Sequence, residues 1–205
     1  FTRITKLLNT DLPRYLSNLC LKKKIHFVHI STDCVFLGNK GNYLDNSKKD
    51  AKDLYGLSKK KGEIKNKFSA TLRTSFIGPE AKSRKSLLNW FLSQKNEVNG
   101  FNKAFFSGLT SLELSKIIYK YYIEKTNNYN SILNVGGYKI SKYNLLTIIN
   151  KIFNKKIKVK KFSDFKIDRS LNSSKFKKLT GYKKVKWVKL INNIKTFMDK
   201  NNFKY

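Results

Sequence analysis

The stretch Ile30-Ser31-Thr32-Asp33-Cys34-Val35-Phe36 marks the chain as an α/β protein. It continues an apolar run over residues 25–30, which is too short for a helix and rich in branched and aromatic residues, and which therefore predicts a buried strand. Two hydroxyls and a carboxylate then stand at the carboxyl end of that strand, where open α/β sheets place their ligands. Thr32 and Asp33 are therefore candidate site residues.

Elements on both sides of this stretch have the order typical of a parallel sheet. A helix is predicted to begin at Asp11 with Pro13, because apolar residues follow there at helical spacing. After the strand comes a loop rich in Gly, Asn and Asp over 38–45, then a helix over 53–67 and a strand over 70–74. Strand, helix and strand in succession predict a parallel sheet of α/β type.

Beyond residue 80 the alternation loosens, which predicts a small α+β lobe attached to the sheet. Ser141 is the expected N-cap of one of its helices. Helices are predicted over 86–94, 111–125, 141–153, 173–179 and 187–200, and strands over 132–135 and 157–162.

The 205 residues carry a formal net charge of +31. The lysines are spread along the whole chain rather than gathered in one arm or helix face, which indicates solvated surface, and no nucleic-acid partner is expected. A nucleic-acid or anionic membrane surface is the alternative interpretation. A positive field would also help to capture an anionic nucleotide ligand. No apolar run approaches the ~20 residues that a membrane span needs, so no membrane partner is expected.

Cysteine and histidine give no sign of a metal site. Cys20 and Cys34 are too few for a disulfide framework or a metal cluster, so a reducing cytoplasmic setting is predicted. His26 and His29 lack zinc-site spacing and are predicted to pack in the strand.

Tyr55 and Lys59 are the second group of candidate site residues. They stand at positions i and i+4 of the helix predicted over 53–67, so they share one of its faces. A lysine ammonium beside a phenol favours the phenolate, which predicts a lowered pKa for Tyr55 and a proton donor near neutral pH. The Thr32 hydroxyl would hydrogen-bond the same carbonyl oxygen. Each signal alone is common on helix surfaces and at strand ends; their combination is far more specific.

Three stretches then carry a family resemblance: HISTDCVF (29–36), YGLSKKKGE (55–63) and LRTSFIGPE (72–80). They resemble the extended short-chain dehydrogenases/reductases, and especially the dTDP-4-dehydrorhamnose reductases and related sugar-nucleotide reductases. The resemblance continues through WFLSQ, VNGFNKAFFSGLTSLELSKII, ISKYNLL and DRSLNSSKF, so that it covers nearly the whole chain.

The resemblance implies a partial Rossmann-like fold, a doubly wound parallel sheet, with a small C-terminal α+β substrate-binding lobe. Residues 1–80 would form the C-terminal part of an NAD(P)-binding Rossmann domain. Residues 81–205 would form mainly the substrate-binding lobe, with interleaved sheet elements.

The family's roles are carried over to the matching residues. Tyr55 is implied as the proton donor to the sugar's keto oxygen, and Lys59 as the residue that lowers the tyrosine pKa and grips the nicotinamide ribose. Thr32 is implied as the hydroxyl that polarises the substrate, with Asp33 beside it against the sugar. Phe76 falls where the rhamnose enzymes commonly have a tryptophan that packs on the substrate; a core aromatic is the alternative.

The roles of four further residues stay open. Cys34 stands where tyrosine is usual, which leaves the particular sugar undecided. Arg169 and Asn172 either help to form the nucleotide-sugar side or start a helix. Asn9 either lines the site or, as the favoured interpretation, caps a helix.

The implied function is NAD(P)H-dependent reduction of a 4-keto-6-deoxy nucleotide sugar in surface polysaccharide precursor synthesis. NADPH or NADH would be the cofactor, a nucleotide sugar the substrate, and a homodimer the candidate assembly; no metal is expected. The alternatives are a nucleotide-sugar epimerase or dehydratase of the same superfamily and a non-catalytic NADP-binding regulatory subunit. A basic nucleic-acid-binding protein is less favoured.

The start of the chain departs from a complete dinucleotide fold. It opens on Phe1 in a helical pattern, its first glycine is Gly38, and no strand leads into a glycine-rich turn. By the resemblance, the family's first β-α units, roughly 60 to 90 residues, would precede Phe1. The chain as given is therefore expected to have little or no activity.

Overall fold

A three-stranded parallel sheet organises the first part of the chain in the computed structural model, which describes residues 2–80, 86–124 and 130–203. Its strands are β1 (Phe27–Ser31), β2 (Ser69–Arg73) and β7 (Ile132–Asn134), in the order β1-β2-β7. The helix α3 (Leu54–Gly62) connects β1 to β2. The prediction of an α/β fold with a parallel sheet is confirmed.

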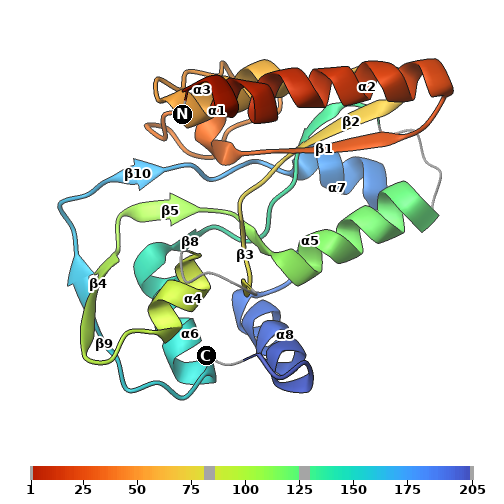
Figure 1. Cartoon of the computed structure of the whole chain (residues 1–205). Helices are drawn as coiled ribbons and strands as arrows, with labels where there is room; N and C mark the ends of the chain where they lie inside the picture. The colour runs from red at the N-terminus through yellow and green to blue at the C-terminus, as the bar shows by residue number, and fades with distance from the viewer. Residues whose placement is uncertain (1, 81–85, 125–129, 204–205) are drawn as a thin grey trace.

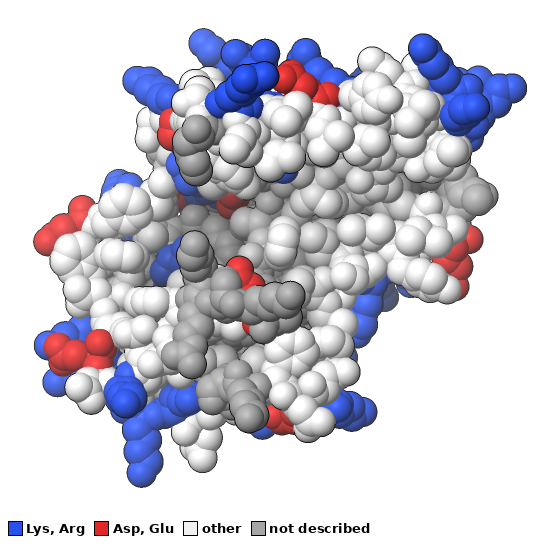
Figure 2. Space-filling view, in the orientation of Figure 1, with Lys and Arg blue, Asp and Glu red and all other residues white. Residues whose placement is uncertain are grey.

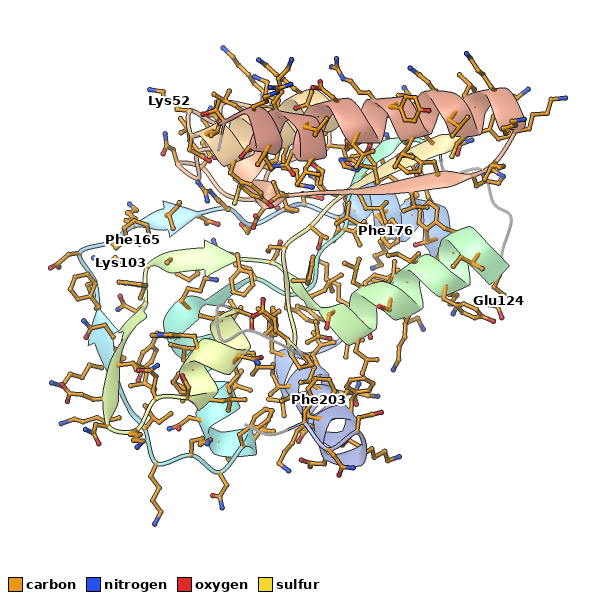
Figure 3. The ribbon with its side chains drawn as sticks, viewed as in Figure 1. Lys52, Lys103, Glu124, Phe165, Phe176 and Phe203 are labelled. Atoms are coloured by element: carbon orange, nitrogen blue, oxygen red, sulfur yellow. The ribbon has the colours of Figure 1, made fainter. Side chains whose placement is uncertain are left out.

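Helices cover both faces of this sheet (Figure 1). On one face lie α1 (Thr2–Lys6), α2 (Leu12–Lys23) and α3. On the other lie α5 (Ser111–Ile118) and α7 (Ser174–Thr180). Phe176 of α7 is fully buried on this side of the sheet (Figure 3). Phe176 packs with Leu72 of β2 and Leu133 of β7, so the core lies directly against the sheet.

The rest of the chain forms a lobe with its own apolar core. Its helices are α4 (Leu87–Leu92), α6 (Lys142–Ile152) and α8 (Trp187–Lys200). Its strand pairs are β4 (Glu97–Phe101) with β9 (Lys158–Phe162), β3 (Phe76–Ile77) with β6 (Leu109–Thr110), and β5 (Ala104–Phe106) with both β8 (Ile140–Ser141) and β10 (Ile167–Asp168). The domain boundary at residue 80 stays a prediction; the sheet takes β7 from beyond it.

The first helix does not begin at Asp11. Asp11 has helical backbone angles (φ −76°, ψ −47°) and makes no capping bond, because it ends a π-helical turn, Leu7–Asp11, that joins α1 to α2. In that turn the Leu12 amide bonds to the Leu7 carbonyl. The wider turn accommodates Pro13, whose ring nitrogen cannot donate to the preceding turn.

Three later boundaries also bear on the predictions. The helix predicted over 53–67 ends at Gly62, because Glu63 leaves it for an ion pair described below. The helix predicted over 111–125 continues α5 as a π-helical turn, Tyr119–Glu124; residue 125 lies outside the described residues. Ser141 is an N-cap as predicted, with its Oγ accepting the Asn144 amide at 3.1 Å.

The π-helical turn holds α3 in place. Asn9 Nδ2 donates to Ser58 Oγ at 3.1 Å, and Thr10 Oγ1 donates to the Ser58 carbonyl at 2.8 Å. A Cβ atom on Gly62 would meet the Asn9 carbonyl oxygen at 1.9 Å. The favoured interpretation of Asn9 as an N-cap is therefore wrong: it lies inside the helix and supports α3.

We expect Gly62→Ala to lower the free energy of unfolding by about 1–3 kcal/mol, because the added methyl group pushes α3 away from backbone that cannot yield. Urea denaturation measures the change. Lys61→Ala is the matched control, since Lys61 is the exposed neighbour on the same helix and should leave stability unchanged. Equal stability of the two variants would contradict the close packing described here.

Basic side chains are scattered over several parts of the face shown in Figure 2 rather than gathered into one patch. This distribution agrees with the interpretation of the lysines as solvated surface. Among the described helices, none is both long and apolar enough to span a membrane.

Candidate active site

A cavity of about 760 Å³ opens at the carboxyl end of β1, between the sheet and the lobe. The structure brings all five predicted site residues to its wall: Thr32, Asp33, Tyr55, Lys59 and Phe76. The sheet side contributes the first four. The lobe contributes others from across the cavity, among them Phe106, Lys142 and Arg169.

Thr32 and Tyr55 come from different elements and meet in this wall. Thr32 starts a 3₁₀ turn, Asp33–Val35, and its Oγ1 accepts the Cys34 amide at 3.1 Å. The two side chains lie close enough for Thr32 to act on the pKa of Tyr55. The contact requires Gly56, because a Cβ atom there would meet the Cys34 carbonyl oxygen at 2.4 Å.

The electrostatic setting of Tyr55 differs from the prediction. Burial raises the pKa of its phenol, the charges of Cys34, Asp33 and Asp53 act in the same direction, and the side chain of Thr32 opposes them. The predicted lowering by Lys59 is not found, because the Lys59 ammonium is directed to the end of β1. Tyr55 is therefore a protonated phenol at neutral pH, which is the form that a proton donor requires.

Lys59 is fixed by the backbone of β1. Its Nζ donates to the Ile30 carbonyl at 2.9 Å, and burial lowers its pKa. An ammonium group has three donors. With one donor bonded to Ile30, the others are available to a ligand in the cavity that Lys59 lines.

Asp33 and Arg169 line the same cavity as Tyr55, and the charge of Arg169 acts on Asp33. Burial raises the pKa of the Asp33 carboxyl; a hydrogen bond from Ser75 and the charge of Arg169 oppose that shift. Arg169 donates from Nε to the Phe36 carbonyl at 3.0 Å and from Nη1 to Cys34 Sγ at 3.2 Å. Arg169 therefore belongs to the cavity wall.

Asn172 has the other role that the sequence left open. Its Oδ1 accepts the Ser174 amide at 3.0 Å, so it helps to start α7. It does not line the cavity that holds Thr32 and Tyr55.

Aromatic side chains close the cavity on the lobe side. Phe76 is 54% exposed and lines the cavity, so its interpretation as a core aromatic is wrong. Phe165, near the β10 edge (Figure 3), is 48% exposed and lines the cavity too. Sequence reasoning did not identify Phe165 or Lys142 as site residues, because no local spacing relates them to Thr32 or Tyr55.

A buried ion pair lies directly behind the site. Arg73 donates to both carboxylate oxygens of Glu63, at 2.6 and 2.9 Å, and Lys49 Nζ donates to one of them at 2.7 Å. Ser31 Oγ donates to the same carboxylate at 3.0 Å. Burial alone would raise the pKa of Glu63, but Arg73 and Lys49 outweigh it and lower that pKa. The Glu63 carboxylate thereby joins the ends of β1, β2 and α3.

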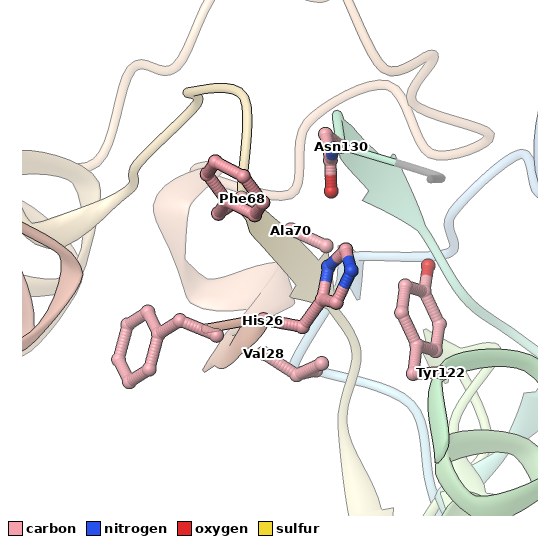
Figure 4. Close-up of a pocket in the computed structure, with 7 residues that line it drawn as sticks. His26, Val28, Phe68, Ala70, Tyr122 and Asn130 are labelled. Atoms are coloured by element: carbon pink, nitrogen blue, oxygen red, sulfur yellow. The ribbon is translucent and has the colours of Figure 1, made fainter. Parts of the chain in front are cut away.

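At the opposite end of the sheet, the described residues form a much smaller cavity. This cavity, of only about 10 Å³, is lined by residues that include His26, Phe68 and Tyr122 (Figure 4). That volume is too small for a ligand larger than a water molecule. His29 packs inside β1, as predicted, and burial lowers its pKa to about 4. Over the described ranges, no group of three or more His, Cys, Asp and Glu could hold a metal ion.

Comparison with known proteins finds one family model that matches part of the chain. Residues 3–99, just under half of the chain, match the family model of the RmlD substrate binding domain. No curated protein matches the chain.

Solved structures match over most of the chain. A hypothetical dTDP-4-dehydrorhamnose reductase from Sulfolobus tokodaii is 26% identical with a TM-score of 0.72, over 87% of this chain and 68% of that one. The dTDP-4-dehydrorhamnose reductase from Bacillus anthracis, in complex with NADP, is 20% identical with a TM-score of 0.79, over 92% and 71%. The dTDP-glucose 4,6-dehydratase from the same organism, in complex with NAD, is 19% identical with a TM-score of 0.73, over 95% and 68%.

The chain shares the Rossmann-type α/β fold of these solved structures. The resemblance to the dTDP-4-dehydrorhamnose reductases is confirmed by the family match and by the solved structures.

Proposed function

We propose that this protein is an NAD(P)H-dependent reductase of a 4-keto-6-deoxy nucleotide sugar, acting in the cytoplasm in the synthesis of surface polysaccharide precursors. The observation that carries the proposal is the convergence of Thr32, Tyr55 and Lys59 on one cavity from a strand end and the next helix. The match to the RmlD substrate binding domain supports the substrate class.

The donor set of the cavity fits a nicotinamide cofactor. Lys59 would hold the ribose hydroxyls, since its ammonium is fixed to Ile30 and retains donors toward the cavity. Tyr55 lies one helical turn away on the same face. The cofactor, when bound, supplies the hydride, and the protein supplies orientation and the proton.

In the proposed reaction, Tyr55 donates its phenolic proton to the keto oxygen of the sugar. The Thr32 hydroxyl hydrogen-bonds the same oxygen and stabilises the charge that develops there. Asp33 lies next to Thr32, against the sugar. Phe76 packs on the sugar ring, because it is exposed at the cavity wall and a flat apolar surface suits a sugar face.

The direct test is turnover of dTDP-4-keto-6-deoxy sugar with NADPH and with NADH, followed by loss of absorbance of the reduced cofactor, using the protein as its gene encodes it. We expect reduction of the keto sugar with one of the two cofactors. Binding of both ligands without any oxidation of the cofactor would favour the non-catalytic alternative.

A second candidate is a nucleotide-sugar epimerase or dehydratase, favoured by the similarity in fold to the dehydratase from Bacillus anthracis. Such enzymes recycle the cofactor within one turnover, so product would form without net oxidation of NADPH. The same assay with product analysis separates the two reactions.

A further inference from the structure

Lys142 is a cation in the cavity wall that has no role in the reaction proposed above. It is the first residue of α6, whose N-cap is Ser141. Its side chain is partly buried and lines the same cavity as Tyr55, and its Nζ lies 4.2 Å from the centre of the Phe106 ring. Burial lowers the pKa of Lys142, so this ammonium group has lost part of its hydration.

No carboxylate in the described part of the chain neutralises Lys142. Asp33 attracts it, but none of the ion pairs within 4.0 Å among these residues includes Lys142. The Asp33 carboxylate instead accepts from Thr32 Oγ1 at 3.3 Å and from Cys34 Sγ at 3.6 Å. Asp33 also faces Arg169, so this part of the wall has two cations for one carboxylate.

We infer that Lys142, together with Arg169, forms an anion-binding subsite whose ligand is an anionic oxygen group of the substrate. The inference rests on the proposed function for the substrate class and deepens it. The group is either a phosphate of the nucleotide or a carboxylate on the sugar; both offer the same oxygen chemistry. Either one would give the Lys142 ammonium a charge-assisted hydrogen bond where burial strengthens it.

Arg169 fits the same subsite. A guanidinium group has five donors, and the donors of Arg169 from Nε and Nη1 are bonded to Phe36 and Cys34. Those two bonds orient the group at the cavity wall while the rest of its donors stay available. A fixed arginine and a partly desolvated lysine that line one cavity and both act on Asp33 suit an oxygen dianion or carboxylate better than a neutral hydroxyl.

Titration calorimetry with dTDP, UDP-glucose and UDP-glucuronate tests the inference. We expect Lys142→Met to weaken binding by about tenfold, as loss of one charged hydrogen bond does. Weaker binding of all three ligands identifies the diphosphate as the anion. Weaker binding of UDP-glucuronate alone identifies a sugar carboxylate. Unchanged affinity for all three ligands overturns the subsite.

Two variants control the experiment. Lys151→Met removes an exposed lysine from the other end of α6 and should bind like the unmodified protein. Lys142→Arg keeps the charge and should restore most of the affinity. Lys142→Met should not lower the melting temperature, because replacing a partly buried, unpaired charge with an apolar chain is seldom destabilising.

The result separates the inference from the proposed function. If Lys142→Met binds with full affinity and the protein reduces a keto sugar, the inference of a subsite is wrong and the proposed reductase function stands. If binding of the nucleotide ligands depends on Lys142 but the keto sugar is not reduced, the inference of a subsite stands and the proposed reductase function is wrong. If the unmodified protein binds none of the three ligands, both are wrong.

Discussion

We expect Tyr55→Phe to lower the turnover number for the proposed reduction of the keto sugar by about 10²–10⁴-fold, with little change in KM. The substitution removes the phenolic oxygen that we propose as the proton donor and keeps the ring that lines the cavity. Steady-state oxidation of NADPH with dTDP-4-keto-6-deoxy sugar measures both constants.

Tyr15→Phe is the matched control for this experiment. Tyr15 is 65% exposed on α2 and outside the cavity, so the loss of its hydroxyl should leave turnover unchanged. Turnover by Tyr55→Phe within about twofold of the unmodified protein would remove the assignment of Tyr55 as proton donor.

Arg73→Met has the largest expected effect on stability, a loss of about 3–5 kcal/mol in the free energy of unfolding. The side chains of Arg73 and Glu63 are 3% and 1% exposed, and removal of the arginine leaves a buried carboxylate with Lys49 as its remaining cation. Guanidinium chloride denaturation measures the change.

The control is Lys160→Met, which breaks an exposed pair between Lys160 and Glu97. Exposed ion pairs contribute about 0–1 kcal/mol, so this variant should unfold close to the midpoint of the unmodified protein. Similar midpoints for Arg73→Met and Lys160→Met would show that the buried pair does not hold the strand ends together.

The same ion pair predicts how stability depends on pH. The folded pKa of Glu63 is lowered, so the unfolded chain binds a proton at this position more readily than the folded chain does. Its contribution is present above the unfolded pKa and is lost as the pH falls through the folded pKa. The unfolding midpoint should therefore fall in acid more steeply for the unmodified protein than for Glu63→Gln, measured by denaturation from pH 7 to pH 3.

Local pattern was enough to predict the parallel sheet and the placement of Thr32, Tyr55 and Lys59. Thr32 follows a short apolar strand, and Tyr55 and Lys59 share a helix face by spacing alone, so their placement depends on neighbours in sequence. Contacts between distant segments were not predictable in this way. Lys142 reaches the cavity from the second half of the chain, and no periodicity links it to Asp33.

The error in the pKa of Tyr55 has the same origin. Spacing on a helix brings Lys59 to the correct face, but the direction of its ammonium is set by the Ile30 carbonyl of a different element. The expected helix beyond Gly62 was wrong for a related reason, since the tertiary partner of Glu63 is stronger than its helix propensity.

The sheet order β1-β2-β7 also governs when the site can form during synthesis. The loop after β1 is fastened by β7: the Asn134 amide donates to Asp45 Oδ1 at 2.6 Å, and its side chain donates to the Tyr43 carbonyl at 2.7 Å. A ribosome must therefore release residue 134 before the first strand's loop can settle. Until then the nascent chain carries an unfinished sheet edge, and pairings so distant in sequence form slowly. A pause of translation after β2 would prolong the exposure of the unpaired sheet edge. A chaperone could bind the nascent chain at this edge.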